Sequence, residues 1–134
     1  MGQPEVTLIA LVLAVVMTAS GLGKIARSDR FRATLTTTYG WTAHFADVLA
    51  PAVPLIELGC AVLLVWPAAR PLGLLVTSAV LIAMSALTAT AWAGGRRGDC
   101  GCWGVVQEQL GVATVARDIL LAVVSIAALA VGLR

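Results

Sequence analysis

The stretch "VTLIALVLAVVMTASGLG", residues 6–23, runs for 18 positions without a charged residue. A helix needs about 20 predominantly apolar residues to cross the hydrocarbon core of a bilayer, so this stretch is predicted to span a membrane. Lys24 and Arg27 follow it directly. The preceding "MGQPE" carries no basic residues, and the apolar stretch is long for a signal peptide, so we expect it to be retained.

Three more segments of the same kind follow, at residues 48–66, 71–94 and 111–133. In lipid, helices and closed barrels are the structures that satisfy their own backbone hydrogen bonds. The sequence therefore predicts an all-α fold, a four-helix transmembrane bundle that forms a single integral membrane domain over residues 1–134. Such a protein is expected to be a multi-pass protein of the cell membrane.

The composition excludes some functions. Hydrophobic residues make up 60% of the chain and charged residues 12%, against roughly 45–50% and about 25% in an ordinary soluble domain. The main partner of this surface is therefore expected to be the lipid bilayer. A net charge of +2 provides no basic face for a nucleic acid, so nucleic-acid binding is not expected.

The connection between the first two spans, residues 24–46, has a helical pattern of its own. Ser28 or Asp29 can begin a short helix, and Phe31, Leu35 and Tyr39 recur at helical spacing. This pattern is typical of an amphipathic helix that lies at the membrane interface. With four spans, this connection and the one at residues 95–110 are expected on the same side of the membrane, and the two termini on the other.

The second of these connections contains "RRGDCGCWG", residues 96–104. A disulfide between Cys100 and Cys102 would close a very small ring, and strained, exposed disulfides tend to be labile and oxidising. We therefore predict a redox-active dithiol, with Trp103 as a flat apolar surface for a partner or a quinone ring. A static bridge or a pair of inert thiols is the main alternative.

A metal site at these cysteines is a weaker alternative. Structural zinc sites use about four ligands at characteristic spacings. The residues available to complete such a set are Cys60, His44 and Asp99, and none has a characteristic spacing. No metal is expected.

Glu57 lies inside the second predicted span. A carboxylate within a membrane is costly unless it is protonated or paired, so Glu57 is a candidate functional residue, one to two turns from the end that faces the cysteine connection. Pro54 and Cys60, each three residues away, are predicted on about the same face. Glu57 is thus a candidate for moving the proton of thiol–disulfide exchange, with Cys60 as an accessory thiol. A structural ion pair with Lys24 or Arg117 is the alternative.

Arg117 and Asp118 are the charged residues of the fourth predicted span. Consecutive residues of a helix point about 100° apart, so these two side chains need not pair with each other. Arg117 can extend to the interface while Asp118 turns inward. A structural network is the main expectation for this pair, with an accessory role in the site as the alternative.

The chain resembles the methylamine-utilisation MauE family, within the DoxX-like group of small four-helix membrane proteins. The motifs that carry the resemblance are Gly23–Lys24, "PLIE" at residues 54–57, "CGCWG" at residues 100–104 and Arg117–Asp118. Family members often have Phe at the position of Trp103. The resemblance implies thiol redox or disulfide formation on exported proteins, a thioredoxin-like partner and a quinone as candidate electron acceptor.

Two functional hypotheses follow. The first is a membrane thiol–disulfide oxidoreductase, with Cys100, Cys102 and Glu57 as catalytic residues. The second is a non-catalytic subunit of a larger membrane complex, in which the two cysteines form a structural bridge. The arginines near both connections favour a cytoplasmic location for the cysteines by the positive-inside rule, whereas oxidation of exported proteins requires the outer face; the sequence leaves both orientations open.

Overall fold

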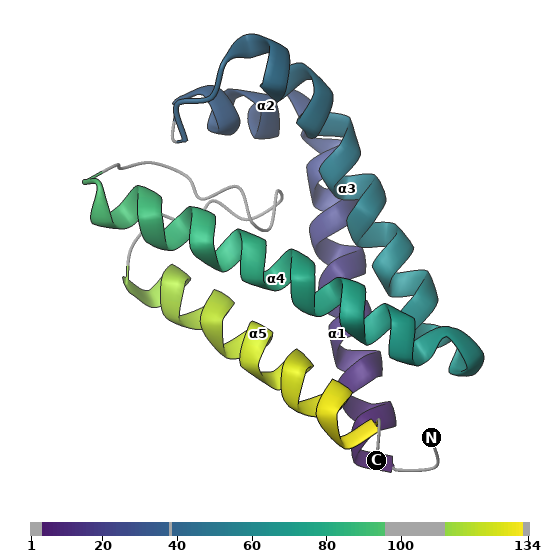
Figure 1. Cartoon of the computed structure of the whole chain (residues 1–134). Helices are drawn as coiled ribbons and strands as arrows, with labels where there is room; N and C mark the ends of the chain where they lie inside the picture. Colours follow the sequence, from purple (N-terminus) through teal and green to yellow (C-terminus); the bar gives the residue numbers. More distant parts are fainter. Residues whose placement is uncertain (1–3, 38, 96–111, 133–134) are drawn as a thin grey trace.

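The computed structural model describes residues 4–37, 39–95 and 112–132. Within these ranges the chain is helical apart from short turns and has no strand (Figure 1). The elements in chain order are α1 (Pro4–Ala26), α2 (Ser28–Thr37), α3 (Ala43–Val65), the 3-10 turn η1 (Pro67–Ala69), α4 (Arg70–Ala93) and α5 (Val112–Gly132).

Four of these helices, α1, α3, α4 and α5, are long and apolar enough to cross a membrane, with mean hydropathies of 2.1–2.3. The predicted all-α, four-helix transmembrane fold with a short helix after the first span is confirmed. Many large apolar side chains point outward; Leu8 and Val15, for example, are 64% and 69% exposed. Such a surface requires lipid as its solvent, and the chain is a multi-pass integral membrane protein.

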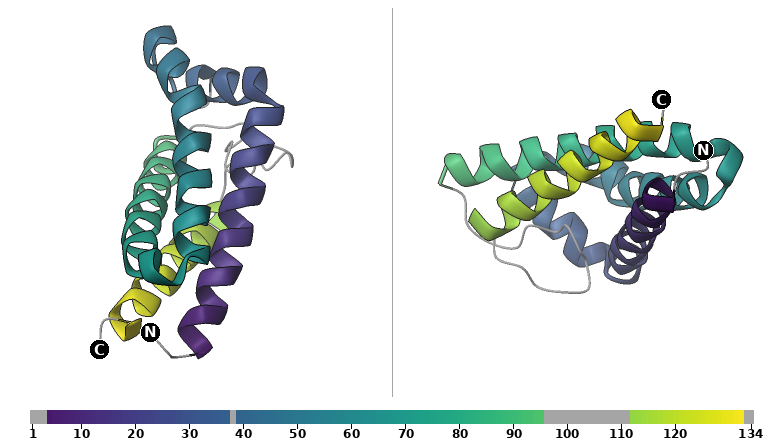
Figure 2. Two further views of the ribbon diagram at one scale, coloured as in Figure 1. Left: turned by 90° about the vertical axis from the view of Figure 1, so that its right-hand side faces the viewer. Right: turned by 90° about the horizontal axis from the view of Figure 1, so that it is seen from below.

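The four spanning helices form a closed ring of neighbours. α1 packs along α3 and α4 along α5, and contacts between α3 and α4 and between α1 and α5 join the two pairs. Figure 1 and the left view of Figure 2 show α4 and α5 crossing the α1–α3 pair obliquely, with both termini at one end of the molecule. Each span therefore contributes side chains to a shared interior.

The short helix α2 covers the opposite end of the bundle. Its apolar residues Phe31 and Leu35 form a cluster with Ala46 and Ala50 of α3 and with Ala91 near the end of α4. Helical spacing correctly predicts this helix. However, its apolar face packs on protein rather than on the acyl chains, because the first turns of α3 extend beyond the end of α1 and offer a surface to cover (Figure 1).

The turn between α2 and α3 sets where α3 begins. Gly40 has a φ of 70°, a left-handed conformation that glycine adopts without strain. Thr42 then caps α3 by accepting a hydrogen bond from the backbone N–H of Phe45. As a result α3 begins at Ala43, five residues before the predicted span at residue 48.

The crossing of α3 and α4 depends on Gly73. A Cβ atom at this position would lie 2.9 Å from the Leu63 carbonyl carbon and from the Leu64 nitrogen. Both atoms belong to backbone, which cannot move aside as a side chain can. The absence of a side chain at Gly73 therefore sets how closely the two helices approach.

We expect Gly73→Ala to destabilise the protein by about 1–3 kcal/mol, since overpacking forces the two backbones apart. The measurement is unfolding in detergent micelles, by heat or by SDS titration. Gly59→Ala is the matched control, because no atom lies within 4 Å of a Cβ placed there, and it is expected to leave stability unchanged or slightly higher. Equal stability of the two variants would contradict the tight crossing.

Candidate functional site

A buried ion pair joins α1 to α3. The Lys24 Nζ atom lies 2.9 Å from Glu57 Oε1 and 3.0 Å from Glu57 Oε2. The side chains of Lys24 and Glu57 are 0% and 4% exposed. The sequence leaves two alternatives for Glu57, a proton-carrying group and an ion-paired group. In the structure, Glu57 forms the ion pair, and its partner is Lys24.

Ser20 completes this network from one turn earlier on α1. Its hydroxyl donates to Glu57 Oε1 at 3.2 Å and accepts a hydrogen bond from Lys24 Nζ. The Lys24 ammonium also lies 5.5 Å from the centre of the Phe31 ring of α2, a cation–π contact. Lys24 is therefore enclosed by a carboxylate, a hydroxyl and an aromatic face.

The backbones of α1 and α3 must come close for this pair to form. At Gly21 an added Cβ would lie 3.0 Å from Leu58 Cγ and 3.1 Å from the Pro54 carbonyl oxygen. Gly21 thus packs against α3 directly after Ser20 and about one turn before Lys24. Small residues at helix contacts allow this kind of approach in membranes.

The depth of Glu57 differs from the sequence prediction of one to two turns. Glu57 lies 14 residues after the start of α3 at Ala43, which is about four helical turns. It is nevertheless level with the last turn of α1, where Lys24 lies. The prediction was wrong because the first turns of α3 project past α1 to pack on α2.

A second buried ion pair lies on α5. Arg117 Nη2 is 3.2 Å from Asp118 Oδ1, and the Thr88 hydroxyl of α4 donates to Asp118 Oδ2 at 3.2 Å. The expectation that Arg117 and Asp118 need not pair is therefore corrected. The side chain of Asp118 is 6% exposed, and the Arg117 guanidinium contacts its carboxylate from the preceding position of the helix.

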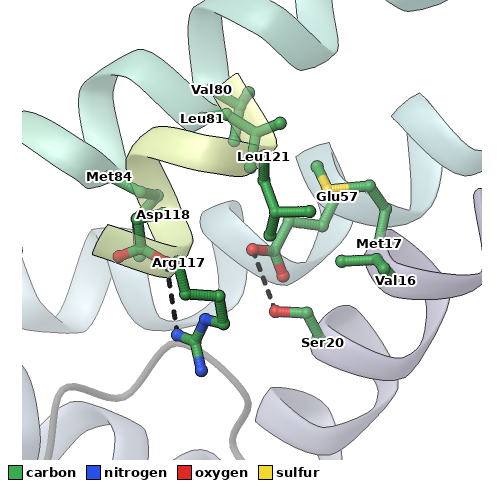
Figure 3. A pocket seen from close by; sticks show the side chains of 10 residues that line it. All are labelled: Val16, Met17, Ser20, Glu57, Val80, Leu81, Met84, Arg117, Asp118 and Leu121. Atoms are coloured by element: carbon green, nitrogen blue, oxygen red, sulfur yellow. Dashed lines mark hydrogen bonds and ion pairs between the residues drawn. The ribbon is translucent and has the colours of Figure 1, made fainter. Parts of the chain in front are cut away.

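A small cavity of about 30 Å³ lies between the two ion pairs. Its polar walls are formed by Ser20, Glu57, Arg117 and Asp118 (Figure 3). The remaining wall is apolar and comes from α1, α4 and α5: Val16, Met17, Val80, Leu81, Met84 and Leu121. This volume holds one or two water molecules.

Cys60 lies one turn beyond Glu57 on α3 and is 1% exposed. Pro54, Glu57 and Cys60 are all buried, so the predicted stripe does face the interior of the bundle. The Cys60 thiol lies beside the Thr77 hydroxyl of α4 and packs within the apolar core. An enclosed thiol of this kind is inert toward a protein partner until the helices separate.

Cys100, Cys102 and Trp103 lie outside the described residues, and so does Asp99. The helices on either side of their connection are described. Ala91, near the end of α4, packs in the cluster around α2, and Arg117 and Asp118, in the second turn of α5, line the cavity beside Glu57. Within residues 4–37, 39–95 and 112–132, no three His, Cys, Asp or Glu side chains gather as a metal site would require.

Several polar residues of this interior carry no signal in the sequence. Ser20 and Thr88 look like ordinary small residues of apolar helices, yet each contacts a buried carboxylate. Arg70, at the opposite end, is also buried. Its Nε donates to the Leu64 carbonyl at 3.0 Å and its Nη1 to the Thr7 hydroxyl at 3.4 Å, so it ties α4 to α3 and α1.

The sequence profile of the family described as methylamine utilisation protein MauE matches residues 4–131. The chain belongs to the MauE family. The match extends over all four membrane helices and therefore includes Lys24, Glu57, Arg117 and Asp118. No curated protein and no solved structure matches the chain.

We expect Lys24→Met to destabilise the bundle by about 3–5 kcal/mol, because it leaves the Glu57 carboxylate buried without its cation. The double variant Lys24→Met/Glu57→Gln is expected to recover most of this loss, since neither charge remains. Unfolding in detergent measures both.

The matched control is Arg32→Met. Arg32 pairs with Asp47, but their side chains are 42% and 60% exposed. Asp47 raises the pKa of the Arg32 guanidinium through their hydrogen bond, yet solvent screens such a pair and its removal is expected to change stability little. A Lys24→Met protein as stable as Arg32→Met would contradict the structural importance of the buried pair.

Proposed function

We propose that this MauE-family protein is a membrane-embedded thiol–disulfide redox protein that acts in methylamine utilisation. Cys100 and Cys102 exchange electrons with a thioredoxin-like or exported partner protein. The observation that carries the proposal is the Cys100-Gly101-Cys102 sequence in a chain of this family. The buried carboxylate of Glu57, beside the helix that follows those cysteines, supports it.

The exchange step conserves atoms and electrons. The thiolate of one cysteine attacks a sulfur of the partner's disulfide, which breaks the partner's S–S bond and forms a mixed disulfide. The second cysteine displaces the partner, forming the Cys100–Cys102 bond, and the two thiol protons end on the partner's thiols. The same reaction in reverse transfers the Cys100–Cys102 disulfide to the partner, which is oxidised while the two cysteines are reduced. Net turnover then requires a membrane electron carrier, for which we propose a quinone that accepts two electrons and two protons.

Glu57 is proposed as a proton-handling or positioning group for this chemistry, and Lys24, Arg117 and Asp118 as residues that set its charge. Supporting this role, Glu57 receives hydrogen bonds from Lys24 and Ser20 and borders a cavity on its other side. Trp103 is proposed as an apolar contact for the partner or the quinone. Cys60, the accessory thiol of the sequence prediction, is proposed to take no direct part in the exchange, since it is buried in the core.

A second candidate is a non-catalytic subunit of a larger membrane complex, with the two cysteines as a static bridge. The observation that favours it is the charge balance inside the bundle. Lys24 with Glu57 and Arg117 with Asp118 form two neutral pairs, an arrangement that also serves purely to hold helices together.

For orientation, we propose that the cysteine connection faces outward. The number of basic residues near the first and third connections overstates the positive charge on that side of the membrane. Lys24 is fully buried in its ion pair, and Arg32 pairs with Asp47. Lys24 therefore lies inside the bundle and not in the flanking connection, so it is left out of the count of basic residues on which the positive-inside rule rests.

Cys100→Ser and Cys102→Ser are expected to abolish thiol transfer to and from the partner, because either change prevents the intramolecular disulfide. The measurement in intact cells is differential alkylation with a membrane-impermeant maleimide, before and after reduction. We expect the two cysteines to react only after reduction and from the outside.

Cys60→Ser is the matched control and is expected to retain thiol transfer. Wild-type levels of disulfide formation in cells that carry Cys100→Ser or Cys102→Ser would refute the redox proposal and leave the structural subunit. Labelling that requires permeabilised cells would overturn the outward orientation alone.

A further inference from the structure

The cavity brings together polar side chains from three helices, and those from α3 and α5 are charged. Glu57 of α3 borders it on one side, and Arg117 and Asp118 of α5 border it on the other, with the Ser20 hydroxyl of α1 beside Glu57. Figure 3 shows the carboxyl groups of Glu57 and Asp118 on opposite sides of this space. α4 contributes Val80, Leu81 and Met84, which are apolar.

A cavity with these walls is suited to water. Empty protein cavities are lined by apolar groups, whereas a water molecule needs two to four polar partners and about 10–15 Å³ of accessible space. The cavity offers about 30 Å³ and four polar side chains. Six of its ten lining residues are apolar, and the four polar side chains are the groups available to hydrogen-bond one or two waters.

The two ends of the charge cluster differ in how deeply their side chains are buried. On the Lys24 side the ammonium is 0% exposed, and the Phe31 ring of α2 lies over it. On the α5 side the Arg117 side chain is 24% exposed. The α5 side is therefore the more accessible end of the charge cluster.

We propose that the cavity is a water-binding site that connects Glu57 to Asp118 and forms a proton route between the buried carboxylate and the exposed side of α5. The groups that face Glu57 along this route are Lys24 of α1 and Arg117 and Asp118 of α5. α4 presents the Thr88 hydroxyl to Asp118 and α2 the Phe31 ring to Lys24.

The charges balance along the route. With both carboxylates ionised, the charges of Lys24, Glu57, Arg117 and Asp118 sum to zero among the residues that the structure describes. A proton taken up by Glu57 raises the charge of these four residues to +1, and its transfer through water to Asp118 keeps that value while it moves the proton toward the partly exposed Arg117. The use of this route for the protons of thiol oxidation rests on the proposed function, whereas the water site does not.

The test is water-edited solid-state NMR of the whole protein in lipid bilayers, with ¹³C labels on the carboxyl carbons. Magnetisation transfer from water to Glu57 and Asp118 is expected to be several-fold faster than to the backbone of Leu64, which is 0% exposed. Exchange of the Lys24 ammonium protons for deuterium is expected to follow the same route.

The decisive variant is Val16→Leu, which fills the cavity without changing any charge. It is expected to reduce water transfer to Glu57 several-fold and to slow deuterium exchange at Lys24 at least tenfold. Val15→Leu is the matched control, because Val15 is the next residue of α1, is 69% exposed and does not border the cavity. Val80→Leu fills the same space from α4, which keeps the test usable if Val16→Leu does not fold.

Water transfer to Glu57 no faster than to Leu64 in the wild-type protein would overturn the proposal, as would equal spectra for the Val16 and Val15 variants. Neither readout depends on thiol chemistry. The water site therefore stands or falls separately from the redox function tested by Cys100→Ser and Cys102→Ser.

Discussion

A lysine and a glutamate that meet inside a bilayer constrain each other and the helices that carry them. Each charge alone in hydrocarbon costs several kcal/mol, so the pair is stable only when the two groups stay in contact. Lys24 donates to both carboxylate oxygens of Glu57, and the hydroxyl of Ser20 supplies a further hydrogen bond. Because apolar side chains gain little by leaving lipid for protein, this polar contact fixes which faces of α1 and α3 meet.

The remaining features follow from that contact. The close approach at Gly21 brings the α1 backbone near enough for Lys24 to reach α3, and α2 covers the ammonium with Phe31. On the far side of Glu57 the helices leave a small cavity, where Arg117 and Asp118 form the second neutral pair. The interior thus combines a sealed end, at Lys24, with a more accessible end, at Arg117.

The sequence predicts the fold well because the solvent is lipid. Four long apolar segments leave few alternatives to a helical bundle, and the spacing of Phe31 and Leu35 identifies the short helix. The sequence also identifies Glu57 as a candidate residue and predicts that Pro54 and Cys60 lie on the same face of the helix. It leaves the choice of Lys24 over Arg117 open, places Glu57 too near the end of its helix and misses the pairing of Arg117 with Asp118. The first two features depend on how far each helix extends past its neighbour, and the third depends on the side-chain conformation of Arg117 on its own helix. The pattern of hydrophobic residues encodes neither.

The central claim is that Lys24 and Glu57 are in direct contact in the membrane. The most direct test is a dipolar-recoupling NMR measurement in lipid bilayers between ¹⁵N at Lys24 Nζ and ¹³C at the Glu57 carboxyl carbon. Nitrogen–oxygen distances of 2.9 and 3.0 Å predict a strong coupling between the two labelled atoms. The absence of measurable coupling in folded, bilayer-embedded protein would contradict the account.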